Sequence, residues 1–254
     1  MKEIKTIGII GYGKFSKLLK TMFEDVIVDV QIKFSSRSKK IDNKDFFDFE
    51  DACKCDIVIP SVPIKAFEKV TREVAKYIDN DSIFIDVCSI KSYPKKIMIK
   101  ELPVEVMKIC THPMYGPESY KHNNNSVEGF NIVIENINAS EEIYNIVKDI
   151  FIKLKNKIVE ISAERHDELA SEFHFTTLTI SHVLKTLSMK RTEIDTVSAS
   201  RMHDFVERIG ADMEITEDMY NFNPFCSKQF DKIKMSIEET MSQISNKQLR
   251  LKEE

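Results

Sequence analysis

Short apolar runs alternate with amphipathic stretches through residues 1–161 of the chain. The run Ile7-Gly8-Ile9-Ile10 has no polar side chain, which is typical of a parallel strand covered by helices on both faces. In the stretches between runs, apolar residues recur every three or four positions, as on one helix face. We expect strands at 4–10, 26–34, 56–59, 83–87, 107–110, 131–134 and 158–161. This alternation predicts an α/β fold with a doubly wound parallel sheet.

After residue 161 the strand-like runs stop and helical spacing continues alone. We expect helices at 162–187, 198–209 and 218–251, and therefore two domains, 1–161 and 162–254, the second all-helical. The last helix is highly charged and needs another surface to cover its sparse apolar stripe, which runs through Phe225, Phe230, Ile233, Ile237, Met241 and Ile244.

Composition narrows the class of protein. The 254 residues carry 41 acidic and 37 basic side chains, a formal charge of −4, and 42% are hydrophobic, enough to build a core. The mild negative charge argues against a nucleic-acid binder. No segment approaches the roughly 18 consecutive apolar residues of a membrane helix. We expect a protein that acts on small molecules and binds neither nucleic acid nor membrane.

The cysteines and histidines predict no metal site. Five cysteines make neither a disulfide framework nor a pair of zinc-ligand spacings, so we expect reduced, mostly buried thiols. His166, His174 and His182 are eight residues apart, a spacing that does not bring helical side chains to one point. The expected strand 4–10 follows Met1 almost directly and leaves no room for a targeting peptide, so a reducing, cytoplasmic compartment is expected.

A glycine-rich turn follows the first expected strand. Gly11 permits a tight turn, Gly13 lets the backbone approach a pyrophosphate, and Ser16 is small enough for close packing. This motif, between a strand and a helix of an alternating chain, predicts a Rossmann-type dinucleotide site. The expected cofactor contacts are Gly11, Gly13, Lys14, Phe15, Ser16, Ser36, Arg37, Ser38, Ser61 and Pro113.

The end of the second strand favours NADP over NAD. NAD sites usually have an acidic residue there, for the ribose hydroxyls. Residues 34–40 contain no acid, three cations and three serines, among them Ser36, Arg37 and Ser38. Hydroxyls and a guanidinium match a 2′-phosphate. The alternative interpretation is a solvated basic loop.

His112 is the candidate base. It follows an expected strand, where open α/β sheets bind ligands, and Pro113 and Gly116 flank it. A histidine pKa near 6.5 suits proton abstraction from an alcohol. A lone histidine is more often structural, so this segment alone leaves both roles open.

The motifs together resemble the prephenate/arogenate dehydrogenases of tyrosine biosynthesis, and most closely the plant-type arogenate dehydrogenases. The resemblance covers nearly the whole chain. The segments that carry it are Gly11-x-Gly13, the Ser-Arg-Ser turn at 36–38, Asp86-x-x-Ser89-x-Lys91, His112-Pro113-Met114-x-Gly116-Pro117-Glu118 and Ala163-Glu164-x-His166-Asp167.

The resemblance implies oxidative decarboxylation of a cyclohexadienol. His112 accepts the proton of the C4 hydroxyl, the C4 hydride passes to NADP⁺, and the ring carboxylate leaves as CO₂. Ser89 orients the hydroxyl or the histidine. Arg208, after a one-residue shift, resembles the arginine that binds the substrate carboxylate; Arg201 is the second candidate, and a surface arginine is the alternative reading of Arg208.

Three further features bear on the substrate and the assembly. Lys91 and His174 are expected substrate contacts, although His174 is displaced from the usual bacterial pattern and a second histidine is missing. Asp212 aligns with an acid of the plant-type enzymes, and a carboxylate would favour the ammonium group of arogenate over prephenate. The resemblance also implies a homodimer formed through the C-terminal helices.

Two alternatives remain open on the residues alone. One is another NADP-dependent dehydrogenase or reductase, of the β-hydroxyacid or imine type, which would share the glycine turn and a helical second domain. The other is a non-catalytic protein that senses nucleotides on the same frame. The first would oxidise a different substrate, and the second would bind cofactor without turnover.

Overall fold

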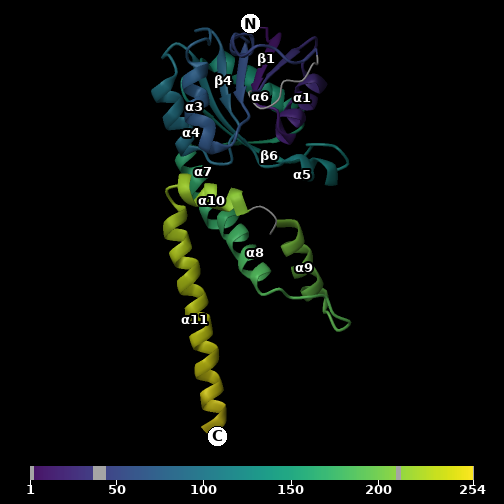
Figure 1. The fold of residues 1–254 in the computed structure, drawn as a ribbon, viewed down its shortest axis with the longest axis vertical. Helices are drawn as coiled ribbons and strands as arrows, with labels where there is room; N and C mark the ends of the chain where they lie inside the picture. The colour runs from purple at the N-terminus through teal and green to yellow at the C-terminus, as the bar shows by residue number, and fades with distance from the viewer. Residues whose placement is uncertain (1–2, 37–43, 210–212, 254) are drawn as a thin grey trace. The chain divides into compact units, whose positions relative to one another are not determined.

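The computed structural model describes residues 3–36, 44–209 and 213–253, and side chains for residues 3–36, 44–207 and 213–246. The chain divides into two compact units, Met1–His166 and Asp167–Glu254. The division falls inside helix α7 (Ala163–Ala170). In Figure 1 the first unit is coloured purple to teal and the second green to yellow. Each unit is described in turn.

The first unit is built on a seven-stranded sheet in the order β2-β1-β3-β4-β5-β6-β7. The five strands from β2 to β5 in this order run parallel to one another, which confirms the Rossmann-type α/β prediction. The strands are β1 (Thr6–Ile10), β2 (Gln31–Ser35), β3 (Ile57–Pro60), β4 (Ile83–Asp86), β5 (Met107–Pro113), β6 (Asn131–Asn136) and β7 (Lys157–Glu160).

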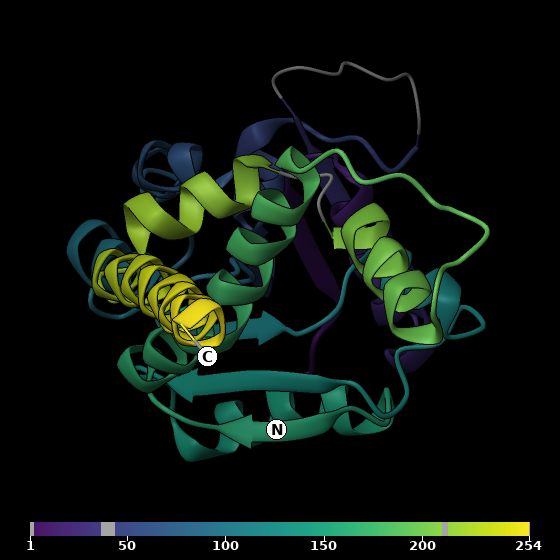
Figure 2. The same cartoon turned by 90° about the horizontal axis from the view of Figure 1, so that it is seen from below.

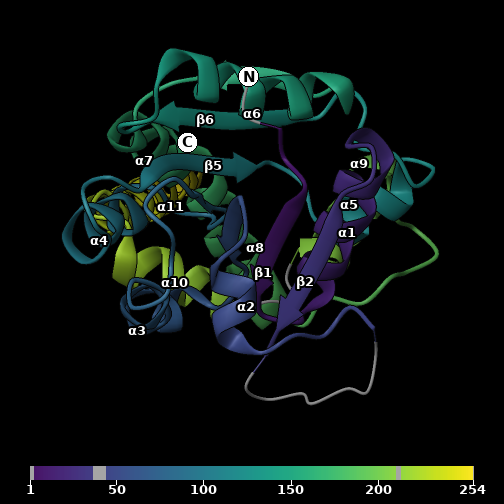
Figure 3. The same ribbon diagram turned by 90° about the horizontal axis from the view of Figure 1, so that it is seen from above.

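Two strands depart from the expected all-parallel sheet. β6 runs antiparallel to β5, and β7 runs parallel to β6. The arrows of β5 and β6 point in opposite directions in Figure 3, and β6 and β7 point the same way in Figure 2. Apolar periodicity identifies a strand but not its direction, so the sequence pattern could not predict this reversal.

Helices cover both faces of the sheet. α1 packs with α6 and α3 packs with α4. Apolar side chains of α1 and α6 form one core with strand residues such as Ile7, Ile59 and Ile109. The helices of this unit are α1 (Lys14–Val26), α2 (Phe49–Cys53), α3 (Ile64–Val74), α4 (Ser92–Glu101), α5 (Pro117–His122) and α6 (Glu141–Lys153).

The expected strand at 26–34 is wrong in its first half. The apolar face of α1, which buries Met22 and Phe23, carries the helix on to Val26. The chain then turns at Asp29, whose φ is 55°, and only Gln31–Ser35 is extended. Helical spacing and a strand-like run overlap at Val26, so the pattern did not separate them.

The second unit is all-helical. The rest of α7 leads into a π-helical turn, η1 (Ser171–Phe175), and then into α8 (Thr176–Thr186). α9 (Val197–Ile209), α10 (Met213–Phe222) and α11 (Cys226–Glu253) follow. α10 and α11 both pack against η1 and α8, where Phe175, Tyr220 and Phe230 form an aromatic cluster.

The single helix expected at 218–251 is two helices. The break lies at Asn223 and Pro224, because proline disfavours helical geometry in the residue before it. The Asn223 side chain accepts a hydrogen bond from the Phe225 N–H at 3.0 Å, and its amide donates to the Asp167 carbonyl at 2.8 Å. Asn223 therefore stabilises the turn before α11 and ties it to α7.

Candidate active site

The glycine turn joins the ends of three strands. The Gly11 N–H donates to the Ser35 carbonyl at 2.8 Å, which links the end of β1 to the end of β2. Gly11 has a φ of 122°, and a Cβ there would lie 2.2 Å from the Ser61 carbonyl oxygen, just after β3. Only glycine fits this position without distortion. The turn between β1 and α1 is thus packed closely against the end of β3.

Ser16 closes the turn. It is fully buried in the first turn of α1, and its hydroxyl accepts a hydrogen bond from the Gly13 N–H at 3.1 Å. The same hydroxyl donates to the Ser61 hydroxyl at 3.0 Å. A small side chain is required here, as expected, and the hydroxyl adds two hydrogen bonds that glycine or alanine could not make.

The N-terminus of α1 suits an anion. Lys14, Phe15 and Ser16 are its first residues, and the N–H groups of a first helical turn have no intrahelical acceptor. The first turn contains no acidic side chain. Oriented N–H groups and the positive end of the helix dipole favour a phosphate group at this end of the helix.

The end of β2 leads towards the residues expected to select the cofactor. Ser35 is buried and Ser36 is half-buried, whereas Arg37 and Ser38 lie outside the described residues. An acid does approach this strand, because the Asp45 carbonyl accepts the Phe34 N–H at 2.7 Å. Its carboxylate lies 3.3 Å from Lys20 Nζ, so it is engaged in an ion pair.

His112 lies within β5 rather than after it, because the ladder to β6 continues as far as Pro113. The imidazole is buried, and its Nδ1 lies 2.8 Å from Nε2 of His166 on α7. The two rings stand nearly edge to face, with an interplanar angle of 72°. A hydrogen bond to one ring nitrogen fixes the orientation and tautomer of a histidine, as a general base requires.

His166 is a candidate functional residue that sequence reasoning missed. It was interpreted by its spacing from His174 and His182 along the helices, which says nothing of partners on the sheet. Its only signal was its position in the Ala163-Glu164-x-His166-Asp167 motif.

A buried ion pair lies beside this pair of histidines. Lys91 Nζ donates to the Asp86 carboxylate and to the Thr111 carbonyl, next to His112 in the chain. The Thr111 hydroxyl donates to the Asp86 carbonyl at 2.7 Å. Burial is the largest single effect and lowers the pKa of Lys91, but the Asp86 carboxylate and the nearby cysteines together raise it above its ordinary value. These contacts join the ends of β4 and β5 next to His112.

The expected role of Lys91 as a substrate contact is therefore corrected. Its side chain is only 1% exposed and its ammonium binds two protein acceptors. Lys91 supports the strand that carries His112. Ser89, in contrast, is exposed in the connection between β4 and α4. Pro113 is the buried last residue of β5. Both lie at the carboxyl edge of the parallel strands, as do the glycine turn and His112.

The comparisons with known proteins identify the family. The family described as "Prephenate dehydrogenase, nucleotide-binding domain" matches residues 18–160, more than half of the chain. Arogenate dehydrogenase 2, chloroplastic, of Arabidopsis thaliana is 30% identical over 94% of this chain and 69% of its own length. The chain belongs to the prephenate dehydrogenase family. This membership places it among the oxidoreductases of tyrosine biosynthesis.

A second plant relative and a solved structure are also similar to this prephenate dehydrogenase family member. Arogenate dehydrogenase 1, chloroplastic, of Arabidopsis thaliana is 29% identical, and the match covers 94% of this chain but only 39% of that protein. The crystal structure of prephenate dehydrogenase from A. aeolicus in complex with hydroxyphenyl propionate and NAD⁺ shares the fold. Its TM-score is 0.75 at 16% identity, over 96% of this chain and 92% of that one.

The remaining predicted substrate residues belong to the second unit. His174 is half-buried in η1. Arg201 is exposed on α9, and Arg208 lies near the end of the same helix, beyond the last described side chain before the gap. Asp212 lies outside the described residues.

The cysteines of this family member fit the expected buried thiols. All five are free and buried. Burial raises the pKa of Cys53 to about 12, so this group stays a neutral thiol.

Within the described residues, no three His, Cys, Asp or Glu side chains form a metal-binding group. In the same part of the chain, no helix is long and apolar enough to cross a bilayer.

Proposed function

We propose that this protein oxidises and decarboxylates arogenate or prephenate, transferring a hydride to NADP⁺ and giving tyrosine or 4-hydroxyphenylpyruvate. The observation that carries the proposal is the His112–His166 pair. A buried imidazole, oriented through Nδ1 at 2.8 Å, stands at the same edge of the sheet as a glycine turn suited to a dinucleotide. Family membership supplies the substrate class.

His112 would act as the general base. Because Nδ1 is bonded to His166, Nε2 is the nitrogen that would take the proton of the C4 hydroxyl. This role requires His112 to donate from Nδ1 and His166 to accept at Nε2. As His112 becomes an imidazolium, this charge-assisted hydrogen bond strengthens and stabilises the new charge. Loss of the ring carboxylate as CO₂ then makes the product aromatic.

The residues of the turn fit a nicotinamide dinucleotide. Gly11 lets the backbone pack against Ser61, and a Cβ at Gly13 would meet no atom closer than the Ser16 hydroxyl at 4.0 Å, so the backbone there is open to a pyrophosphate. Gly11, Gly13, Lys14, Phe15, Ser16 and Ser61 would hold the pyrophosphate, and Pro113 would border the nicotinamide. When bound, the cofactor accepts the hydride from C4.

NADP is proposed over NAD. Residues 34–40 contain no acid for the ribose hydroxyls, and Asp45, the acid near β2, is paired with Lys20. Ser36, Arg37 and Ser38 would supply hydroxyl and guanidinium donors to a 2′-phosphate. NAD lacks that phosphate and would not use these donors.

Arogenate is the proposed preference between the two substrates. Ser89, exposed beside the end of β4, would orient the C4 hydroxyl or His112. Arg208 would bind the substrate carboxylate, with Arg201 as the alternative. Asp212 and the half-buried His174 would face the amino-acid side chain, and the Asp212 carboxylate would favour an ammonium group over a keto group.

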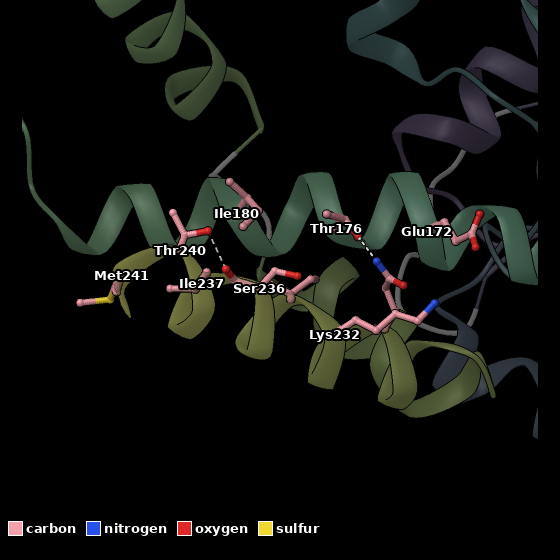
Figure 4. A pocket seen from close by; sticks show the side chains of 10 residues that line it. Glu172, Thr176, Ile180, Lys232, Ser236, Ile237, Thr240 and Met241 are labelled. Atoms are coloured by element: carbon pink, nitrogen blue, oxygen red, sulfur yellow. Dashed lines mark hydrogen bonds between the residues drawn. The ribbon is translucent and has the colours of Figure 1, made fainter. Parts of the chain in front are cut away.

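A homodimer through the C-terminal helices is also proposed. α11 has 28 residues, about 42 Å of helix at roughly 1.5 Å per residue. Met241 is 64% exposed, and Met235 and Ile244 are exposed with it. A groove of about 620 Å³ separates α8 and η1 from α11, with Ile180 and Ile237 among its lining residues (Figure 4). A second copy of the chain would cover these exposed apolar residues of α11. Light scattering tests this: the wild type should have the mass of a dimer, and Met241→Glu should shift it towards the monomer.

The function is tested by steady-state assays of the purified chain. Arogenate and prephenate are each offered with NADP⁺ and with NAD⁺, and reduced nicotinamide and product are both measured. We expect the highest kcat/KM with arogenate and NADP⁺. Turnover of a β-hydroxyacid but of neither cyclohexadienol would overturn the proposal. Cofactor binding without turnover on any substrate would instead support the nucleotide-sensing alternative.

A further inference from the structure

Glu135 occupies an unusual place for a carboxylate. It lies on β6 directly opposite Cys110 of β5, two residues from Val133, which is paired with His112. Because side chains alternate along a strand, Glu135 projects from the same face of the sheet as His112, one row away. Its side chain is only 19% exposed. A carboxylate at such a position must be compensated by donors.

Both oxygens of Glu135 have donors. Oε2 accepts the backbone N–H of Ala163 at 2.8 Å, and Oε1 accepts from Lys95 Nζ at 2.8 Å. Ala163 is the buried first residue of α7, so its N–H has no acceptor within its own helix. Glu135 thus caps α7 from the sheet, and its negative charge matches the positive end of the helix dipole.

The cap lies one turn before His166. The N–H of His166 donates to the Ser162 carbonyl at 2.9 Å, and the Arg165 N–H donates to the Ser162 hydroxyl at 3.1 Å. These hydrogen bonds connect the residues of the first turn of α7 to one another. The position of Ala163 on the sheet therefore determines where the His166 imidazole stands relative to His112.

Lys95 extends this anchor to α4. Its Nζ lies 2.8 Å from Glu135 Oε1 and 3.2 Å from Glu164 Oε2, so it joins α4, β6 and α7. Burial lowers the pKa of Lys95, but the hydrogen bond to Glu135 is the largest of several contacts that together raise it. Lys91, the N-cap residue directly before α4, donates to the Thr111 carbonyl. Both partners of the His112–His166 pair are thus attached to the same helix.

We propose that Glu135, with Lys95, is a positioning residue that holds His166 against His112 and so orients the base. The inference rests on the proposed function of His112. It assigns to Glu135 an effect on turnover, not on cofactor binding, that is exerted entirely through His166.

The test is a double-mutant cycle on the full chain. Glu135→Ala is compared in the wild-type and His166→Ala backgrounds, and the control Glu128→Ala removes an exposed ion pair to Lys155 that is remote from α7. We expect Glu135→Ala to lower kcat by roughly 10- to 100-fold, as for a small misplacement of a catalytic group, with cofactor affinity unchanged. In the His166→Ala background the further loss should be less than about twofold. Glu135→Gln should recover part of the activity, because its amide oxygen can still accept the Ala163 N–H.

The proposal would be overturned if Glu135→Ala lowered kcat equally in the two backgrounds. It would also be overturned if Glu128→Ala lowered kcat as much as Glu135→Ala does. If Glu135→Ala does not fold, Lys95→Met replaces it in the same cycle. ¹⁵N NMR of the imidazoles separates this proposal from the proposed function. If the wild type oxidises neither substrate, the proposed function fails. Loss of the His112–His166 hydrogen bond in Glu135→Ala would still support the anchor, and an unchanged spectrum would reject it.

Discussion

Nδ1 of His112 and Nε2 of His166 lie 2.8 Å apart, although 54 positions separate the two residues in the chain. One is on a strand of the sheet and the other on the helix that ends the first unit. A hydrogen bond between two neutral imidazoles needs one donor and one acceptor, so each ring determines the tautomer of the other. A base at Nε2 of His112 requires the arrangement in which His112 donates from Nδ1 and His166 accepts.

The first prediction concerns the base itself. His112→Asn should keep cofactor affinity and lose roughly 10²- to 10⁴-fold in kcat, the usual range for a positioned general base. Cofactor titration and steady-state kinetics measure both quantities. His122→Asn, an exposed histidine on α5, is the matched control. Activity of His112→Asn within a few-fold of wild type would reject this base.

The second prediction concerns its partner. His166→Ala removes the group that holds Nδ1 of His112, so the base can rotate out of position. We expect kcat to fall by about 10²-fold, the effect of a small error in geometry. His166→Gln, which can still form one hydrogen bond, should lose less. If both variants retain wild-type kcat across the pH range, His166 is structural.

The fold was largely predictable because it depends on patterns within single elements. Buried runs and helical spacing indicated the sheet and the helices that follow it. The direction of β6 was not predictable, because periodicity carries no direction. The break before α11 has a local signal in Asn223-Pro224, which the longer apolar stripe outweighed. The contacts of His166 with His112 and of Lys91 with the Thr111 carbonyl were missed because both partners come from other elements of the fold.

The third prediction concerns cofactor choice. Arg37→Ala removes a guanidinium expected to bind the 2′-phosphate, and a hydrogen bond to a charged group contributes about 1.5–3 kcal/mol. NADP⁺ affinity should therefore fall by roughly 10- to 100-fold, with little change for NAD⁺. The two cofactors serve as each other's control in binding titrations. Equal losses for both would show that this loop does not recognise the phosphate.

The fourth prediction isolates the glycine turn. Gly11→Ala imposes backbone strain of about 1–3 kcal/mol and a contact of 2.2 Å with the Ser61 carbonyl. Gly129→Ala is the matched control, because its φ is 81° but its Cβ would meet nothing within 4 Å. We expect Gly11→Ala to be the less stable of the two in urea unfolding and to bind neither cofactor. Normal cofactor binding by Gly11→Ala would exclude this turn as the dinucleotide site.

The last prediction distinguishes a buried anchor from a substrate contact at Lys91. Lys91→Met leaves the Asp86 carboxylate buried and unpaired and removes the donor to the Thr111 carbonyl. Breaking such a pair should lower the free energy of unfolding by about 3–5 kcal/mol. The double variant Asp86→Asn, Lys91→Met should recover part of this stability, since it removes the unpaired charge. Urea unfolding of the three proteins measures these differences. If Lys91 bound substrate directly, its replacement would instead raise KM and leave the free energy of unfolding nearly unchanged. That result would restore the prediction that Lys91 is a substrate contact.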